Sequence, residues 1–168
     1  MGYEEHRQKA VQSVNCAIIT VSDSRSAAND LSGQEIRRLL EAAGHTVGYY
    51  AIVRDEPGQV RGQIYQIEAN TTCQVILVNG GTGISRRDRT YEAVDGLLDK
   101  RLDGFGELFR MLSFESIGPG AMLSRAVGGV YAGRVVFCMP GSTDAVQLAM
   151  TRLILPELGH LVSELNKK

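Results

Sequence analysis

The chain has 168 residues, of which 43% are hydrophobic and 22% are charged, and its formal net charge is −1. These values are ordinary for one globular domain, and they exclude a disordered acidic chain and a protein held to nucleic acid mainly by overall charge. No apolar run approaches the roughly 20 residues of a membrane-spanning helix. Because the polar start also lacks the apolar core of a secretory signal, we expect a cytoplasmic protein with no membrane or nucleic-acid partner.

The first half of the chain alternates short apolar runs with amphipathic segments. Apolar runs predict strands over 15–21, 46–53 and 75–78, and residues at helical spacing predict helices over 32–43 and around 60–67. Ser32 and Glu35 have the spacing of a capping box at the start of the first helix, and Gly44 follows its end. This alternation is typical of a parallel α/β fold, in which helices cover both faces of the sheet.

The second half is richer in glycine and less regular. We expect a polar arm over 1–14 and a single domain over 15–168. Helical spacing predicts helices over 90–98, around 107–113 and around 121–127. An apolar strand is expected over 134–139, followed by a helix over 142–155 that is interrupted near Pro156 and resumes to about Leu165.

Several kinds of site are excluded by the residues alone. Three cysteines without CxxC spacing argue against a disulfide framework or a zinc site. The three histidines are far apart in the sequence, and the sequence indicates no Ser-His-Asp triad or Cys-His dyad. The patterns GxxxxGK[ST] and GxGxxG are both absent, so the chain is neither a P-loop NTPase nor an ordinary Rossmann dehydrogenase.

Polar residues follow each expected strand, at 22–25, 54–56, 79–90 and 140–143. Ligands of parallel sheets bind beyond the carboxyl ends of the strands, so we expect these segments to converge at one edge. Glycines in the third segment allow a backbone anion nest, and arginines at positions 86, 87 and 89 add positive charge. Asp88 and Asp55 are candidate magnesium contacts there, since Mg²⁺ is usually held by one or two carboxylates and substrate phosphates. The residues alone fit equally well with Asp88 as a helix cap and the arginines as solvated groups. Asp55 taken by itself fits a turn residue better, and it becomes a magnesium candidate only when paired with Asp88.

An ordered series of motifs then resembles a known family. The motifs are TVSDSR (20–25), DLSG (30–33), GGTG (80–83) with Asp88 and Thr90, GFGELFRMLSFESIG (104–118), LSRAVGG (123–129) and MPGST (139–143). Together they resemble the MoaB/MogA family of molybdenum cofactor biosynthesis from about Asn15 onward, and GFGELFRMLSF is closer to MoaB. The resemblance implies a three-layer α/β/α sandwich with a mostly parallel sheet.

The same resemblance implies that Mg-ATP and molybdopterin react to give adenylyl-molybdopterin and pyrophosphate. A separate enzyme would then insert molybdate. Asp55 and Asp88 would be catalytic and hold Mg²⁺, and the nucleotide would bind at Ser22, Asp23, Gly80, Gly81, Thr82 and Gly83. Molybdopterin would contact Gly104, Phe105, Gly106, Glu107, Ser124, Arg125, Pro140, Gly141 and Ser142.

Two further expectations concern assembly and the alternative functions. Family members form trimers, and the MoaB branch often forms hexamers, so we expect a homo-oligomer. The apolar C-terminal residues Ile154, Leu155, Leu158, Leu161, Val162 and Leu165 favour an interface there, because large apolar patches usually mark interfaces. The alternatives to an enzyme are a non-catalytic molybdopterin-binding or scaffolding protein and, less favoured, a general nucleotide-binding module.

Overall fold

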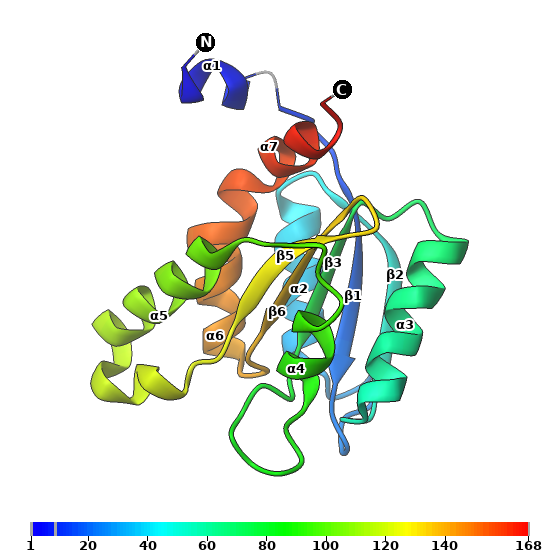
Figure 1. The fold of residues 1–168 in the computed structure, drawn as a ribbon, viewed down its shortest axis with the longest axis vertical. Helices are drawn as coiled ribbons and strands as arrows, with labels where there is room; N and C mark the ends of the chain where they lie inside the picture. Colours follow the sequence, from blue (N-terminus) through cyan, green and yellow to red (C-terminus); the bar gives the residue numbers. More distant parts are fainter. Residues whose placement is uncertain (1, 9, 168) are drawn as a thin grey trace.

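The computed structural model describes residues 2–8 and 10–167 and contains a six-stranded sheet in the order β2-β1-β3-β6-β5-β4 (Figure 1). The strands β2, β1, β3 and β6 are parallel, whereas β5 and β4 run antiparallel to their neighbours. This confirms the mostly parallel sheet. The strands are β1 (Asn15–Val21), β2 (Thr46–Val53), β3 (Val75–Asn79), β4 (Lys100–Arg101), β5 (Val127–Tyr131) and β6 (Arg134–Met139).

Helices cover both faces of the sheet. The helices are α1 (Tyr3–Gln8), α2 (Leu31–Ala42), α3 (Pro57–Asn70), α4 (Thr90–Asp95), α5 (Asp103–Ile117), the 3₁₀-helix η1 (Gly118–Leu123), α6 (Thr143–Ala149), the π-helix η2 (Met150–Ile154) and α7 (Leu155–Leu165). Side chains of α2, α5, α6 and α7 build one core and those of α3 and α4 build the other, which confirms the three-layer sandwich. Among the described residues, no helix is long and apolar enough to span a bilayer.

The burial of β1 on both faces explains why a continuous apolar run predicts a strand here. Cys16 and Ile18 point into the core under α2, while Ala17 and Ile19 point into the core under α3. All four are fully buried, because both faces of a central parallel strand are covered. The three cysteines are free and buried. Burial is as predicted for Cys16 and Cys138, whereas Cys73, for which the sequence allowed more exposure, is only 2% exposed.

The start of α2 differs from the prediction. Asp30, not Ser32, is the N-cap, and its Oδ1 accepts the N–H of Gly33 at 3.1 Å. Ser32 lies inside the helix and donates its hydroxyl to the carbonyl of Gly141 at 2.6 Å. The capping box was therefore misplaced, because Asp two residues earlier is an equally good cap. Gly44 does follow the helix, with a φ of 85°.

The segment around 121–127 is not an α-helix. The 3₁₀-helix η1 ends at Leu123, and Val127 begins β5, which pairs antiparallel with β6. Gly128 and Gly129 lower the β-propensity of this strand, so the sequence does not predict it. Gly129 has a structural reason, since a Cβ there would lie 2.3 Å from the carbonyl oxygen of Lys100 in β4.

The C-terminal segment packs within the monomer. The run from α6 to α7 passes through the π-helix η2, and Pro156 lies in the first turn of α7. Ile154, Leu158 and Val162 are at most 2% exposed, within the core on this side of the sheet. The interface inferred from their apolar character is therefore wrong at these residues, because the chain's own sheet covers them.

The N-terminal arm contacts α7, and both lie at the same end of the molecule (Figure 1). Tyr3 donates its hydroxyl to Glu157, and its ring lies 5.6 Å from that of His160. Arg7 donates to the carbonyl of Pro156 at 3.2 Å. These contacts lie at the end of the sheet opposite the carboxyl edge of the parallel strands.

Candidate functional site at the carboxyl edge of the sheet

The loops that follow the parallel strands are joined to one another. The N–H of Asp55, after β2, donates to Asp23, after β1, at 3.2 Å. The N–H of Gly80, after β3, donates to the carbonyl of Met139 at the end of β6, at 3.0 Å. The four segments therefore converge as predicted. They meet around β1 and β3, where the strand order reverses, and open parallel sheets bind ligands at such a point.

Asp55 is a buried carboxylate at this edge, with 6% exposure. Its Oδ1 accepts the N–H of Arg89 at 3.3 Å and the hydroxyl of Thr90 at 3.1 Å. Gly81 has a φ of 67°, and a Cβ there would lie 2.5 Å from Asp55 Oδ2. Burial raises the pKa of Asp55, and the nearby carboxylates of Asp88 and Asp23 act in the same direction, against the hydrogen bonds that lower it.

Asp88 organises its own loop. Its Oδ2 accepts the N–H of Ser85 at 3.1 Å and the Ser85 hydroxyl at 2.6 Å. A Cβ on Gly83 would lie 2.6 Å from the same oxygen. The N-cap of α4 is Arg89, and no side chain caps that helix, so Asp88 is not the helix cap that the sequence left open. In the described chain, neither Asp88 Oδ1 nor Asp55 Oδ2 accepts a hydrogen bond, so each carboxylate keeps one oxygen for a ligand.

The arginines of the loop after β3 have different environments. Arg87 makes two hydrogen bonds to Asp23, at 2.7 and 3.0 Å, and one to Glu56 at 3.1 Å. The pairing with Arg87 lowers the pKa of Asp23 to about 2. Asp23 is thus at the site, as predicted, but Arg87 already neutralises its charge.

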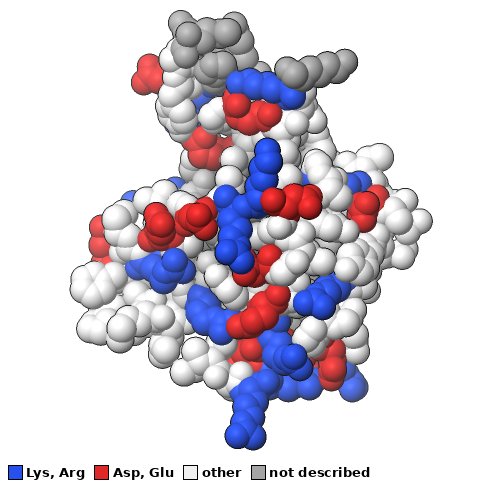
Figure 2. Space-filling view, in the orientation of Figure 1, with Lys and Arg blue, Asp and Glu red and all other residues white. Residues whose placement is uncertain are grey.

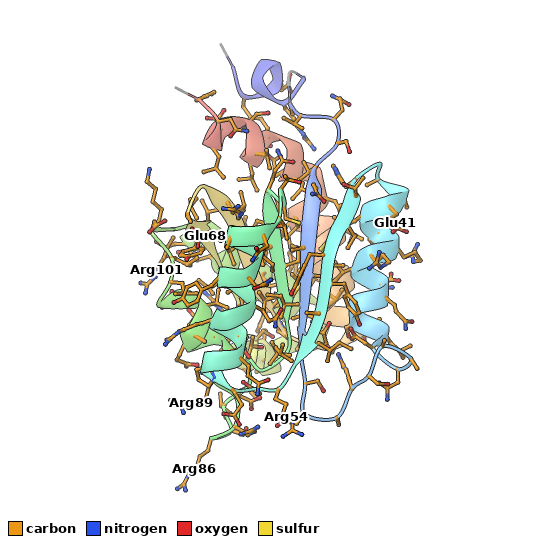
Figure 3. All side chains as sticks on the ribbon, turned by 90° about the vertical axis from the view of Figure 1, so that its right-hand side faces the viewer. Glu41, Arg54, Glu68, Arg86, Arg89 and Arg101 are labelled. Carbon is orange, nitrogen blue, oxygen red and sulfur yellow. The ribbon has the colours of Figure 1, made fainter. Side chains whose placement is uncertain are left out.

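Other arginines at this edge point into solvent. Figure 3 shows Arg54, Arg86 and Arg89 extending from the lower end of the molecule. Their guanidinium groups make no hydrogen bond or ion pair with any described residue. Blue side chains gather at the same end of the space-filling view (Figure 2), where the loop between β3 and α4 lies. This positive surface adjoins the carboxylates of Asp55 and Asp88, so an anion-bound cation suits the edge better than a free anion or cation does.

A groove of about 740 Å³ lies beside the loop after β6, between α5 with η1 and α6 with η2. One part of its wall is apolar, and hydroxyl groups and two charged residues, Asp144 and Arg152, make up much of the rest. The lining residues are Phe109, Ser113, Ser116, Ile117, Leu123, Ser124, Pro140, Ser142, Asp144, Ala145, Gln147, Leu148, Thr151 and Arg152. A planar ring with a polar rim fits such a surface.

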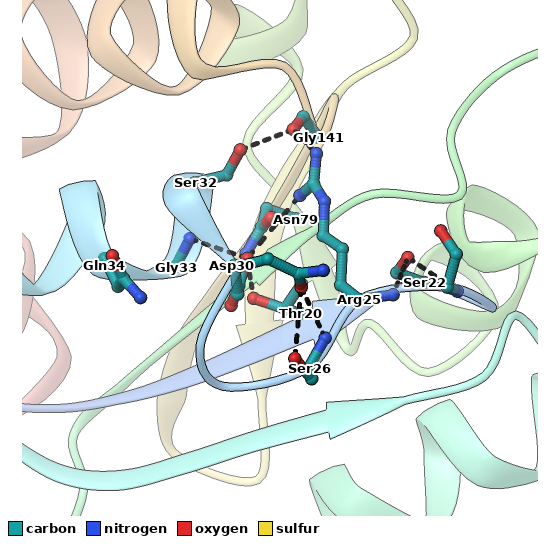
Figure 4. Close-up of polar contacts among 12 residues, drawn as sticks. Thr20, Ser22, Arg25, Ser26, Asp30, Ser32, Gly33, Gln34, Asn79 and Gly141 are labelled. Carbon is teal, nitrogen blue, oxygen red and sulfur yellow. Dashed lines mark hydrogen bonds and ion pairs between the residues drawn. The ribbon is translucent and has the colours of Figure 1, made fainter.

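A buried polar cluster was missed by the sequence reasoning (Figure 4). Asp30 and Asn79 are both fully buried, and Asn79 donates its amide to Thr20 Oγ1 at 3.0 Å. Arg25 lies 3.6 Å from the Asp30 carboxylate. The available signal was the polar residue near the end of each apolar strand, Thr20 in β1 and Asn79 in β3, together with the DLSG motif.

Comparison with known proteins decides the family. A family model described as "Probable molybdopterin binding domain" matches residues 17–160. The chain belongs to this molybdopterin-binding domain family. It is 53% identical over 168 residues to "Molybdenum cofactor biosynthesis protein B" of Halalkalibacterium halodurans, with 99% of each chain covered. It is 46% identical over 168 residues to the protein of that name in Bacillus subtilis, again with 99% of each chain covered.

Solved structures support the same assignment. A crystal structure of "Molybdenum cofactor biosynthesis protein B" has a TM-score of 0.90 and 52% identity, covering 93% of this chain and 98% of the other. The "tungsten cofactor synthesizing protein MoaB from Pyrococcus furiosus" has a TM-score of 0.85 and 34% identity, covering 94% and 100%. The chain is therefore a molybdopterin-binding domain protein of molybdenum cofactor biosynthesis, with the MoaB/MogA fold.

The expected molybdopterin contacts divide into two groups. Ser124, Pro140 and Ser142 line the groove, and Gly141 lies between the last two. Residues 104–107 form the first turn of α5 and are not among its lining residues.

Within that first turn, the four predicted residues have different surroundings. Phe105 is 7% exposed, and its ring centroid lies 4.7 Å from that of Phe137 in the core. Gly106 packs against the carbonyl of Ala126, while Gly104 and Glu107 are exposed. The role of the turn in this structure is packing of α5 against β5 and β6.

Arg125 lies in the segment between η1 and β5. Its guanidinium pairs with Glu92 and lies 4.6 Å from the ring centroid of Tyr91. Glu92 and Tyr91 belong to α4, and Arg125 is not among the groove-lining residues. The geometry favours the structural ion pair over the molybdopterin contact that the family resemblance implies for Arg125.

Arg125→Ala is expected to lower the free energy of unfolding by about 1 kcal/mol, because it removes a cation–π contact and a partly exposed ion pair. Urea denaturation measures this loss, and Arg101→Ala, which breaks the exposed pair with Asp95, is the matched control with a smaller expected effect. Molybdopterin affinity should stay within about twofold of wild type on the same argument. Unchanged stability with much weaker molybdopterin binding would instead assign Arg125 to the substrate.

Proposed function

We propose that this protein is a molybdopterin adenylyltransferase. An oxygen of the terminal phosphate of molybdopterin attacks the α-phosphorus of ATP, a new P–O bond forms, and the bond to the β-phosphate breaks to release pyrophosphate. The observation that carries the proposal is the carboxylate pair Asp55 and Asp88 beside the glycine loop. Gly80 of that loop lies against Gly141, between the groove residues Pro140 and Ser142. A separate enzyme that inserts molybdate would use the adenylylated product.

The carboxylate pair fits a magnesium ion. Burial and, to a smaller extent, the neighbouring charge of Asp88 raise the pKa of Asp55, and each carboxylate has one oxygen without a hydrogen bond from the described residues. The described residues contain no group of three or more His, Cys, Asp or Glu side chains suited to a metal. A two-carboxylate set suits Mg²⁺, which takes its remaining ligands from phosphates and water. When bound, the ion would neutralise charge on the phosphates.

The chain's own residues would meet the other needs of the reaction. Both substrates are anionic, and Arg54, Arg86 and Arg89 can offset their repulsion at the exposed edge. The backbone of Gly80–Gly83 can approach the triphosphate closely, and the groove would hold the pterin so that its phosphate faces this loop. No protein nucleophile is required, since positioning and charge stabilisation suffice for phosphoryl chemistry.

An adenylyl-transfer assay tests the proposal. Purified protein, ATP, molybdopterin and Mg²⁺ should yield pyrophosphate and a pterin product carrying AMP, detected by chromatography, and EDTA should abolish both. Binding of molybdopterin without pyrophosphate release would favour the non-catalytic scaffolding protein. ATP binding that is indifferent to molybdopterin would favour a general nucleotide-binding module.

We further propose that the protein forms a closed homo-oligomer, a trimer or hexamer, through α5 and η1. This surface carries large apolar side chains that the monomer leaves between 46% and 81% exposed: Leu108, Met111, Phe114, Ile117, Met122 and Leu123. Contiguous exposed apolar patches of this kind usually mark interfaces, and a cyclic arrangement buries them without open ends.

Phe114→Glu is expected to convert the oligomer to monomers, because it places a charge within the apolar contact. Analytical ultracentrifugation at micromolar protein measures the mass. Tyr65→Glu is the control, since Tyr65 is 46% exposed on α3, away from this surface. A monomeric wild type, or an oligomer that Phe114→Glu leaves intact, would contradict the proposed interface.

A further inference from the structure

Asp30 is a carboxylate with 0% exposure at the start of α2. It accepts the N–H of Gly33 and, at 2.6 Å, the hydroxyl of Tyr50. Burial and the hydrogen bond to Asp30 raise the pKa of Tyr50, so its phenol remains a donor at neutral pH. A buried charge is tolerated only when it is paired, and the cation beside Asp30 is Arg25, at 3.6 Å. Asp30 thus fixes the position of the Arg25 guanidinium.

The other side of that guanidinium reaches a different loop. Arg25 Nη2 donates to the carbonyl of Gly141 at 2.9 Å, and the hydroxyl of Ser32 donates to the same carbonyl at 2.6 Å (Figure 4). Gly141 lies between Pro140 and Ser142, which both line the groove. One backbone carbonyl beside the groove therefore receives two hydrogen bonds from the segment after β1.

Gly141 also packs against Gly80 of the glycine loop. A Cβ at Gly141 would lie 2.9 Å from the Cα of Gly80. The described chain contains no cis peptide, and in a trans peptide the C=O and the following N–H point in opposite directions. Holding the Gly141 carbonyl toward Arg25 therefore turns the N–H of Ser142 away from Arg25. The same contacts set how the groove wall sits against the glycine loop.

We propose that Arg25, Asp30 and Ser32 form a clamp on the Gly141 carbonyl that positions residues 140–142 for molybdopterin. The clamp rests on the proposed function for the identity of its substrate. Its members are positioning residues, because they act through the Gly141 peptide. The clamp keeps residues 140–142 of the groove wall against Gly80, so that the phosphate of the bound pterin faces the nucleotide loop.

The test compares Arg25→Ala, Arg25→Lys and Ser32→Ala, with Arg101→Ala as the control. Arg101 lies in β4, where it pairs with Asp95, and it contacts neither the clamp nor the groove. Arg25→Ala should weaken molybdopterin binding, measured by pterin fluorescence, by roughly tenfold, the scale of losing a charge-assisted hydrogen bond. ATP binding should change by less than about twofold by the same reasoning, and Arg25→Lys should restore part of the molybdopterin affinity because it keeps a charged donor.

Amide hydrogen exchange supplies a readout that needs no substrate. Arg25→Ala and Ser32→Ala should speed exchange in 141–146 and leave β1 and β3 unchanged. Equal losses of ATP and molybdopterin binding, or unchanged exchange in 141–146, would overturn the clamp. A wild type that binds molybdopterin without adenylyl transfer would refute the enzyme and still test the clamp by binding. A wild type that binds no molybdopterin leaves exchange alone to decide whether the clamp exists, and it overturns the clamp's role toward that substrate.

Discussion

Asp88→Asn is expected to lower the rate of adenylyl transfer by ~10²-fold or more, the scale of losing one major charge-stabilising group. The amide keeps the oxygen that accepts from Ser85, so the loop and the fold should persist. The lost charge is the one that Mg²⁺ would need beside Asp55. Turnover at saturating ATP and molybdopterin measures the effect, and circular dichroism checks the fold.

The matched control for this substitution is Asp99→Asn. Asp99 accepts the N–H of Ala132 in the turn between β5 and β6, at the end of the sheet opposite the site. Asp99→Asn should leave turnover within about twofold, since it removes no charge near the reacting groups. An Asp88→Asn enzyme with wild-type turnover would show that Asp88 serves only its own loop.

The sequence predicted the ranges of three strands as the structure has them. For β1 and β6 the reason is that strands in the middle of a covered sheet show continuous apolar runs. The range of β2 also matches, although β2 is an edge strand and only partly buried. The strand β5 was missed, since its Gly128 and Gly129 satisfy close packing with neighbours that are remote in sequence. The cap of α2 was missed because Asp30 and Ser32, two residues apart, are equally good capping residues, and only the tertiary contact of Ser32 with Gly141 distinguishes them.

The site was predictable to the extent that topology determines it. Parallel strands bring their carboxyl ends together, so the meeting of Asp23, Asp55 and Gly80 follows from strand order. Which arginine would be paired could not be read from the sequence, because Arg86, Arg87 and Arg89 are identical in type. The pairing of Arg87 with Asp23 depends on where two loops lie relative to each other. Residues 104–107 show the same limit, since Phe105 faces the core rather than the groove.

Gly81→Ala is expected to lower the free energy of unfolding by about 2–4 kcal/mol, combining a strained backbone with overpacking. Gly81 has a φ of 67°, and its Cβ would lie 2.1 Å from Thr90 Oγ1 and 2.5 Å from Asp55 Oδ2. Any folded variant must move the Asp55 carboxylate. Since a shift of about 1 Å at a reacting centre can cost ~10²-fold in rate, adenylyl transfer should fall by that order.

Gly44→Ala separates the two causes. Gly44 has a φ of 85°, but a Cβ there meets nothing within 4 Å, so the variant has the backbone strain without the contact. It should cost about 1 kcal/mol in urea denaturation and leave adenylyl transfer unchanged. The excess loss in Gly81→Ala then measures the close approach of the glycine loop to Asp55. Equal stability losses in the two variants, with full activity in both, would mean that the loop has room for a side chain and that Gly81 is needed only for its backbone conformation.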